Sequence, residues 1–157
     1  MVPLMRVLTV CLGNICRSPT AQAAILEAAG AVGIDLEVDS AGTGDWHIGE
    51  LPDKRMRSAA AAAGLTLDSR ARQVEPADLE QFDLVLPMDH DNLRVLESMR
   101  TEVDQAGRIE LFRTWDPDAN GDLEVPDPYY GGSRGFAEVV EICRRTAASL
   151  VEELAAR

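Results

Sequence analysis

The stretch VCLGNICRSPTAQA (residues 10–23) decides the fold, because it joins an apolar run to an alanine-rich run through a short turn. Residues 4–10 (LMRVLTV) are mostly apolar and partly β-branched, which is typical of a strand buried on both faces of a parallel sheet. The Ser-Pro pair at residues 18–19 has the residue types of a helix N-cap and a first helical position. A helix over residues 20–31 should follow, so the stretch predicts a strand–loop–helix unit.

The rest of the chain repeats this alternation of strands and helices. Further strands are predicted at residues 36–41, 82–86 and 108–112, and further helices at 52–63, after Asp89 and over 134–155. Residues 113–133 are rich in Gly, Pro and Asp and predict a long loop of a kind that is often functional. This order predicts an α/β fold, with one three-layer αβα domain over residues 1–157 and a four-stranded parallel sheet. Ligands of such folds bind beyond the carboxyl ends of the strands.

Composition and charge exclude several classes of partner. A chain of 157 residues with 46% hydrophobic and 27% charged residues is ordinary for one soluble globular domain. The net charge of −12 repels phosphate backbones and anionic lipids, so we expect neither nucleic acid nor a membrane as a partner. No apolar run approaches the roughly 20 residues that span a bilayer. An anionic ligand would have to be held by a local arrangement of positive groups.

The cysteines indicate free thiols rather than a disulfide framework. They are an odd number, Cys11, Cys16 and Cys143, in a chain whose N-terminus reads as a first strand and not as a signal peptide. We therefore expect a cytoplasmic protein with reduced cysteines. Cys143 lies on the apolar stripe of the last predicted helix and is expected in the core.

The eight residues CLGNICRS (11–18) have the features of a cradle for an anion. Backbone N–H groups that curl ahead of a helix N-terminus bind phosphate, and the helix dipole adds positive charge there. These amides would come from Leu12, Gly13, Asn14, Ile15 and Cys16. Gly13 and Asn14 are residue types that tolerate the positive φ of a tight ring. Arg17 offers a planar fork to two phosphoryl oxygens, Cys11 should be a thiolate beside this arginine, and Ser18 can donate a hydrogen bond to its sulfur.

Several segments occur in an order that is similar to one known family. The pattern C-x5-R-[ST] is present as VCLGNICRSP, in a strand–loop–helix context. It is followed by DSAGTGDW (39–46), ARQ (71–73), LPMDHDNL (86–93) and VPDPYYGG (125–132). Together these segments resemble the low-molecular-weight protein tyrosine phosphatases along the whole chain, and the resemblance implies the flavodoxin-like sheet topology of that family.

The resemblance implies a role for each matching residue. Cys11 would attack phosphorus and form a phosphocysteine intermediate, while Arg17 and the loop amides hold the equatorial oxygens. Asp127 would protonate the departing phenolic oxygen and then help water to attack the intermediate. The slot for the aryl ring would be walled by Trp46, Tyr129 and Tyr130.

The resemblance also implies the substrates of the protein and whether it needs a cofactor or a metal. The substrates would be proteins or peptides containing phosphotyrosine, and the product would be inorganic phosphate. No cofactor and no metal is implied, since the two histidines lie far apart and lack ligand spacing. We expect a monomer.

Two other enzyme classes share this cradle. Thioredoxin-coupled arsenate reductase needs further cysteines to take up a disulfide, and none occurs between residues 17 and 142. Protein-arginine phosphatases tend to have a small polar residue before the second cysteine, where this chain has Ile15, and a branched aliphatic side chain favours an aryl ring over a guanidinium. A phosphate-binding module without catalysis would lack Cys11 or Asp127.

The sequence does not decide which group supports the loop of residues 11–18. Ser69 stands where the family commonly has a histidine that braces the loop asparagine, so Asn14 would rely on Ser40, Ser69 or water. Cys16 is either a small core residue or, as the resemblance implies, the partner of Cys11 in a reversible disulfide.

Charge predicts an acidic rim around the pocket. Residues 115–133 contain five carboxylates and no Lys or Arg, and Asp45 and Glu50 lie on the opposite loop. On this prediction, peptides with acidic residues beside the phosphotyrosine should be poor substrates.

Overall fold

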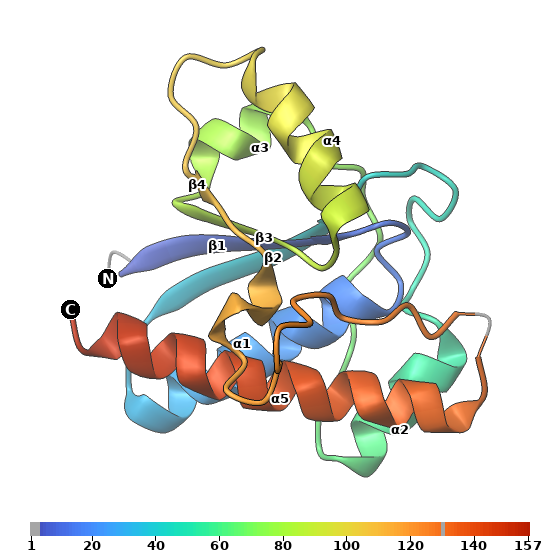
Figure 1. The fold of residues 1–157 in the computed structure, drawn as a ribbon. Helices are drawn as coiled ribbons and strands as arrows, with labels where there is room; N and C mark the ends of the chain where they lie inside the picture. Colours follow the sequence, from blue (N-terminus) through green and yellow to red (C-terminus); the bar gives the residue numbers. More distant parts are fainter. Residues whose placement is uncertain (1–3, 130) are drawn as a thin grey trace.

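Four parallel strands form the centre of the protein in the order β2-β1-β3-β4 (Figure 1). β1 (Met5–Cys11) pairs with β2 (Leu36–Gly42) along its whole length, β3 (Leu84–Pro87) lies on its other side, and β4 (Arg108–Ile109) forms the edge. The computed structural model describes residues 4–129 and 131–157. The strand order and the parallel pairing confirm the predicted flavodoxin-like sheet.

Helices cover both faces of this sheet. α1 (Arg17–Val32), α2 (Lys54–Ala62) and α5 (Ser133–Ala155) lie on one face, whereas α3 (Pro76–Gln81) and α4 (His90–Arg100) lie on the other (Figure 1). Side chains alternate across β1, so Val7 belongs to the core under α1 and α5, and Leu8 to the core under α3 and α4. The three-layer αβα arrangement is therefore confirmed. Within the described residues, no helix is long and apolar enough to cross a membrane.

The start of α1 differs from the prediction. The helix begins at Arg17, and its N-cap is Cys16, which makes no side-chain capping hydrogen bond. The hydroxyl oxygen of Ser18 instead lies 3.0 Å from the sulfur of Cys11 and accepts a hydrogen bond of 2.8 Å from Asn14 Nδ2. The prediction of Ser18 as the N-cap was therefore wrong, because this hydroxyl supports the loop and not the helix end.

Three other elements differ from the predicted pattern. The six-residue helix α3 was missed because it is too short for an apolar period; its signal is Pro76 inside a capping box formed by Glu75 and Asp78. α2 begins at Lys54, not Pro52. The fourth strand spans two residues, and the chain then turns into the 3-10 helix η1 (Phe112–Trp115).

Candidate active site

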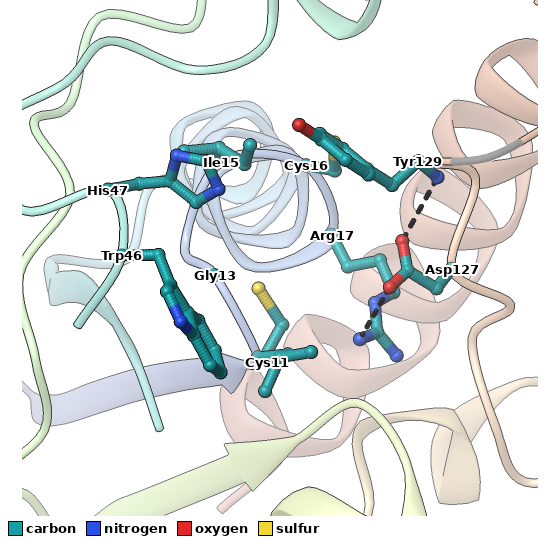
Figure 2. A pocket seen from close by; sticks show the side chains of 10 residues that line it. Cys11, Gly13, Ile15, Cys16, Arg17, Trp46, His47, Asp127 and Tyr129 are labelled. Atoms are coloured by element: carbon teal, nitrogen blue, oxygen red, sulfur yellow. Dashed lines mark hydrogen bonds and ion pairs between the residues drawn. The ribbon is translucent and has the colours of Figure 1, made fainter. Parts of the chain in front are cut away.

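A pocket of about 380 Å³ opens at the carboxyl end of β1, where residues 12–16 lead into α1 (Figure 2). Its lining consists of Cys11, Leu12, Gly13, Ile15, Cys16, Arg17, Trp46, His47, Asp127 and Tyr129. The fold thus brings the predicted site residues together, with Asn14 and Ser18 buried beside Cys11. Tyr130, predicted as a wall residue, lies outside the described residues. His47 was not among the predicted site residues, although its position next to Trp46 was a signal for it.

Cys11 ends β1 at the floor of the pocket, and its side chain is surrounded by hydrogen-bonding groups. The backbone N–H of Asn14 donates to Cys11 Sγ across 3.2 Å, and the Ser18 hydroxyl lies 3.0 Å from the same sulfur. The residue is only 2% exposed. The N-terminus of α1 adds its partial positive charge beside these hydrogen-bonding groups. This surrounding suits a nucleophile.

Asn14 is the residue that braces the loop. It adopts the left-handed conformation with φ of 57°, which Asn tolerates better than most residues. Its Nδ2 donates to the hydroxyls of Ser18 and Ser40 at 2.8 and 3.0 Å, and its Oδ1 accepts from the backbone N–H of Arg72 at 3.0 Å. Ser40, one of the three supports predicted for Asn14, is therefore its partner.

Two expectations about this loop need correction. Ser69 forms no hydrogen bond with Asn14; the Arg72 backbone and Ser18, which were not considered, complete the support within the described residues. Gly13 does not adopt a positive φ. A Cβ at Gly13 would lie 3.2 Å from Cδ2 of His47, so the glycine gives room for the imidazole instead.

Arg17 lies almost completely buried behind the loop, between two carboxylates. Its Nη1 donates to Oδ2 of Asp89 at 2.7 Å and to the carbonyl of Val125 at 3.2 Å, and its Nη2 lies 3.6 Å from Oδ2 of Asp127. Burial alone would lower the pKa of Arg17, but the neighbouring Cys11 sulfur and the hydrogen bond to Asp89 outweigh it and raise this pKa. The guanidinium therefore keeps its charge beside Cys11. The sequence analysis used Asp89 only to place the start of the helix that follows it, and its contact with Arg17 was missed.

Asp127 stands at the mouth of the pocket with its carboxylate free to reach solvent. Its Oδ1 accepts the backbone N–H of Tyr129 at 3.1 Å, and its Oδ2 faces the Arg17 guanidinium (Figure 2). The side chain is 41% exposed. The proline at 128 is buried and favours an extended backbone at Asp127, which holds the carboxylate toward the pocket.

Aromatic rings form the upper walls. The rings of His47 and Tyr129 lie 6.2 Å apart between centroids. Trp46 lies on the same side of the opening as His47, and Asp127 lies on the opposite side (Figure 2). Trp46 is 67% exposed, and its ring packs over Gly44, where a Cβ would collide with it. The walls offer a slot for a flat group above a floor that holds a thiol and a guanidinium.

A sequence model of one family, described as low molecular weight phosphotyrosine protein phosphatase, matches residues 6–157. The chain belongs to this family. A low molecular weight protein-tyrosine-phosphatase of Streptomyces coelicolor is 45% identical over 150 residues, which cover 93% of this chain and 91% of that protein. The resemblance seen in the sequence is thus confirmed.

Solved structures of phosphatases agree with this assignment. The protein tyrosine phosphatase of Entamoeba histolytica superposes with a TM-score of 0.87 and 34% identity, over 97% of each chain. An arginine phosphatase of Drosophila superposes with a TM-score of 0.88 and 29% identity, over 95% of this chain and 97% of that one. The fold therefore occurs in phosphatases that are named for two different substrates.

The other two thiols of this low molecular weight phosphatase are unsuited to nucleophilic attack. Burial raises the pKa of Cys16, and the negative charge of Asp53 raises it further. Burial likewise raises the pKa of Cys143, which lies in the core as predicted. All three cysteines are free in the structure, and the Cys11–Cys16 disulfide stays a prediction.

An acidic rim was predicted partly from the five carboxylates on residues 115–133, and four of them lie within ion-pair distance of arginines outside this stretch: Asp116, Asp118, Asp122 and Asp127. Asp116 is buried and accepts hydrogen bonds from Arg113 and Arg145 at 2.7–3.0 Å. Glu124 pairs with His90 at 2.8 Å. The remaining pairs are Asp118 with Arg145 and Asp122 with Arg113. Of the carboxylates on residues 115–133, Asp127 is the one that lines the pocket. Asp45 on the opposite loop is exposed, so the acidic rim as a whole stays a prediction.

Proposed function

We propose that this family member hydrolyses phosphotyrosine in proteins by two displacements at phosphorus, through a phosphocysteine on Cys11. The observation that carries the proposal is the meeting of three groups in one pocket. The sulfur of Cys11 lies at the floor among hydrogen-bond donors, and the carboxylate of Asp127 stands 3.6 Å from the guanidinium of Arg17 at the mouth. A nucleophile, an oxyanion ligand and a proton donor thus face the same space.

In the first step, the Cys11 thiolate attacks phosphorus and the bond from phosphorus to the phenolic oxygen breaks. The electron pair of that bond leaves with the oxygen, and protonated Asp127 supplies the proton that makes it a tyrosine hydroxyl. The Arg17 guanidinium and the amides of residues 12–16 bind the three equatorial oxygens, where negative charge is concentrated. Asp89 keeps the guanidinium in place.

In the second step, water attacks the phosphocysteine in line with sulfur. Asp127, now ionised, takes one proton from this water, and the sulfur leaves with the electron pair of the S–P bond. The Ser18 hydroxyl, 3.0 Å from the sulfur, donates a hydrogen bond to the departing thiolate. Inorganic phosphate is released, and the proton count is restored without a metal ion.

The walls support an aryl substrate. Ile15 and Leu12 present aliphatic surface, and Trp46 and Tyr129 present ring faces, so the slot offers van der Waals contact to a phenyl ring. A phosphoarginine side chain would bring a polar guanidinium against Ile15, which offers it no hydrogen-bond acceptor. A thioredoxin-coupled arsenate reductase would need further reactive cysteines to take up a disulfide. Within the described residues, the cysteine that remains besides Cys11 and Cys16 is Cys143, which is buried in the core.

We also propose that the protein acts as a single-domain monomer in the cytoplasm, on phosphotyrosine proteins. The free thiols are consistent with a reducing compartment. Exposed large apolar side chains away from the pocket include Leu26 on α1 and Val95 on α4, which lie on opposite faces of the sheet. Light scattering after gel filtration tests the monomer, and fractionation of cells tests the location.

The reaction is tested by hydrolysis of an aryl phosphate in the presence of a chelator. Wild type should be active, Cys11→Ser inactive, and rapid quenching of wild type should trap one phosphoryl group on Cys11, located by peptide mass. Activity in Cys11→Ser, or a requirement for a divalent ion, would overturn the mechanism. A kcat/KM for a phosphoarginine peptide above that for the matched phosphotyrosine peptide would overturn the substrate assignment.

A further inference from the structure

A second groove, of about 500 Å³, continues from the catalytic pocket. The two share Ile15, His47 and Tyr129, which Figure 2 shows together on one side of the pocket. Beyond them the groove runs along residues 49–54 to Arg57 and Arg70. A peptide whose phosphotyrosine enters the pocket has to place its neighbouring residues on such adjoining surface, since successive residues advance by only about 3.3 Å.

Three cationic side chains line this groove, and among the residues that the structure describes they have no carboxylate partner. Arg57 donates through Nε to the carbonyl of Pro52 at 3.0 Å, and Arg70 donates through Nη1 to the carbonyl of Gly49 at 3.2 Å. Lys54 lies at the start of α2 and is exposed. Within the described residues, none of the three forms an ion pair. Carbonyl groups hold the two guanidinium groups over the groove and leave their charges unneutralised.

The two carboxylates of the same groove each have a hydrogen-bonding partner. Glu50 lies 3.1 Å from Nδ1 of His47. Asp53 caps α2 and accepts hydrogen bonds from Arg55; although its partial burial acts in the opposite direction, these bonds lower the pKa of Asp53. Lys54, Arg57 and Arg70 outnumber these two carboxylates, so the groove carries a net positive charge on a protein whose net charge is −12.

We propose that this groove is a subsite for an acidic side chain of the substrate, close in sequence to the phosphotyrosine. A carboxylate there would be attracted by Lys54, Arg57 and Arg70, and each guanidinium has donors left after its bond to the carbonyl. The direction of this preference is opposite to that predicted from the acidic loop sequence. The inference rests on the proposed phosphotyrosine hydrolysis and adds the class of sequence that the enzyme prefers.

The test compares kcat/KM at low salt for three phosphotyrosine peptides of equal length: one with neutral flanks, one with two Glu residues before the phosphotyrosine, and one with two after it. At least one acidic peptide should exceed the neutral peptide by about three- to tenfold, since one exposed ion pair changes affinity by about 1.4- to fivefold. This advantage should shrink at high salt, because the charges are exposed. Equal values for all three peptides, or a preference for the neutral one, would overturn the proposal.

Substitutions of the groove arginines test whether this groove causes the preference for acidic peptides. In Arg57→Gln/Arg70→Gln the ratio of acidic to neutral kcat/KM should fall toward one, and in Arg57→Lys/Arg70→Lys, which keeps the charges, it should stay high. The matched control is Arg94→Gln/Arg100→Gln on α4, which removes the same number of charges on the other face of the sheet and should leave the ratio unchanged. If the control lowers the ratio as much as the groove variant does, general charge and not this groove sets the preference, and the proposal fails.

The same assays distinguish failure of the proposed phosphotyrosine hydrolysis from failure of the proposed subsite. If the wild type hydrolyses neither the neutral peptide nor a simple aryl phosphate, the proposed function fails. If it hydrolyses both but shows no acidic preference, only the subsite fails. Because the ratio is measured within each variant, a uniform loss of activity caused by partial unfolding does not alter it.

Discussion

Asp89 uses its two carboxylate oxygens for two different partners. Oδ2 accepts a hydrogen bond of 2.7 Å from Nη1 of Arg17, and Oδ1 accepts one of 2.8 Å from the backbone N–H of Asn92 in the first turn of α4. The catalytic loop and the helix on the other face of the sheet are thereby joined through one side chain. This double use allows the two roles to be separated by substitution.

Asp89→Asn keeps an oxygen that can cap α4 but removes the charge that faces Arg17. We expect kcat/KM for an aryl phosphate to fall about 10- to 100-fold, because hydrogen bonds between charged groups contribute about 1.5–3 kcal/mol. Asp89→Ala should lose the same activity and, in addition, about 1 kcal/mol of unfolding free energy through the lost cap. Urea unfolding and steady-state kinetics measure the two effects. Wild-type kcat/KM in Asp89→Asn would contradict the positioning role.

Asp127→Asn removes the proposed proton donor while it keeps the size of the side chain. We expect kcat to fall by about 10²- to 10⁴-fold for phosphotyrosine, whose phenolic oxygen needs a proton as it leaves. The loss should be smaller for p-nitrophenyl phosphate, because its leaving group is a stable anion. Comparison of the two substrates in wild type and variant checks this. Equal losses for both would argue that Asp127 positions Arg17 instead of donating a proton.

Asn14→Ala removes all three side-chain hydrogen bonds that brace the catalytic loop and puts alanine at a φ of 57°. Each bond contributes about 0.5–1.5 kcal/mol, so we expect a loss of about 2–4 kcal/mol of unfolding free energy together with reduced activity. Ser69→Ala is the control, and it should change stability by less than about 0.5 kcal/mol, since Ser69 forms no side-chain hydrogen bond within the described residues. A destabilisation in Ser69→Ala as large as that in Asn14→Ala would restore the original expectation that Ser69 supports the loop.

The buried Asp116 should make stability depend on pH below neutrality. Burial alone would raise the pKa of Asp116, but the hydrogen bonds from Arg145 and Arg113 outweigh it and hold this pKa well below its ordinary range. A carboxyl whose pKa is lower in the folded state stabilises the fold above its unfolded pKa, of about 3.9. This contribution is lost as the pH falls from about 5 toward the lower, folded-state pKa.

The prediction is tested by urea unfolding at pH 7 and at about pH 3 for Asp116→Asn and Asp118→Asn. Asp116→Asn should lose about 3–5 kcal/mol at pH 7, because it leaves two buried or half-buried arginines without their shared partner, and its stability should vary less with pH. Asp118→Asn should have the same unfolding free energy as wild type at both pH values, because the Asp118 side chain is 69% exposed. An unchanged pH dependence in Asp116→Asn would assign the acid sensitivity to other carboxyls.

Local sequence was enough to predict most of the fold and the identity of the loop. The strand, the turn and the helix around residues 10–23 are set by neighbours in the chain, through buried apolar residues, residue types that permit a left-handed turn, and a good helix sequence. The alternation that follows leaves few topologies other than a parallel sheet with helices on both faces. Since Cys11 and Arg17 are six residues apart on either side of one loop, the sequence placed the thiol and the guanidinium together without any long-range information.

Tertiary structure alone decided which distant side chains meet. Asp89 is 72 residues from Arg17, the backbone of Arg72 is 58 residues from Asn14, and Arg145 is 29 residues from Asp116. Nothing in the local pattern distinguishes a carboxylate that will be neutralised by such a partner from one that will face solvent. For this reason the ion pairs of the loop carboxylates were missed, and the positive groove beside the pocket became visible only in the folded chain. The physical cause is that charges and hydrogen bonds act over a few ångströms of space, whatever the separation along the sequence.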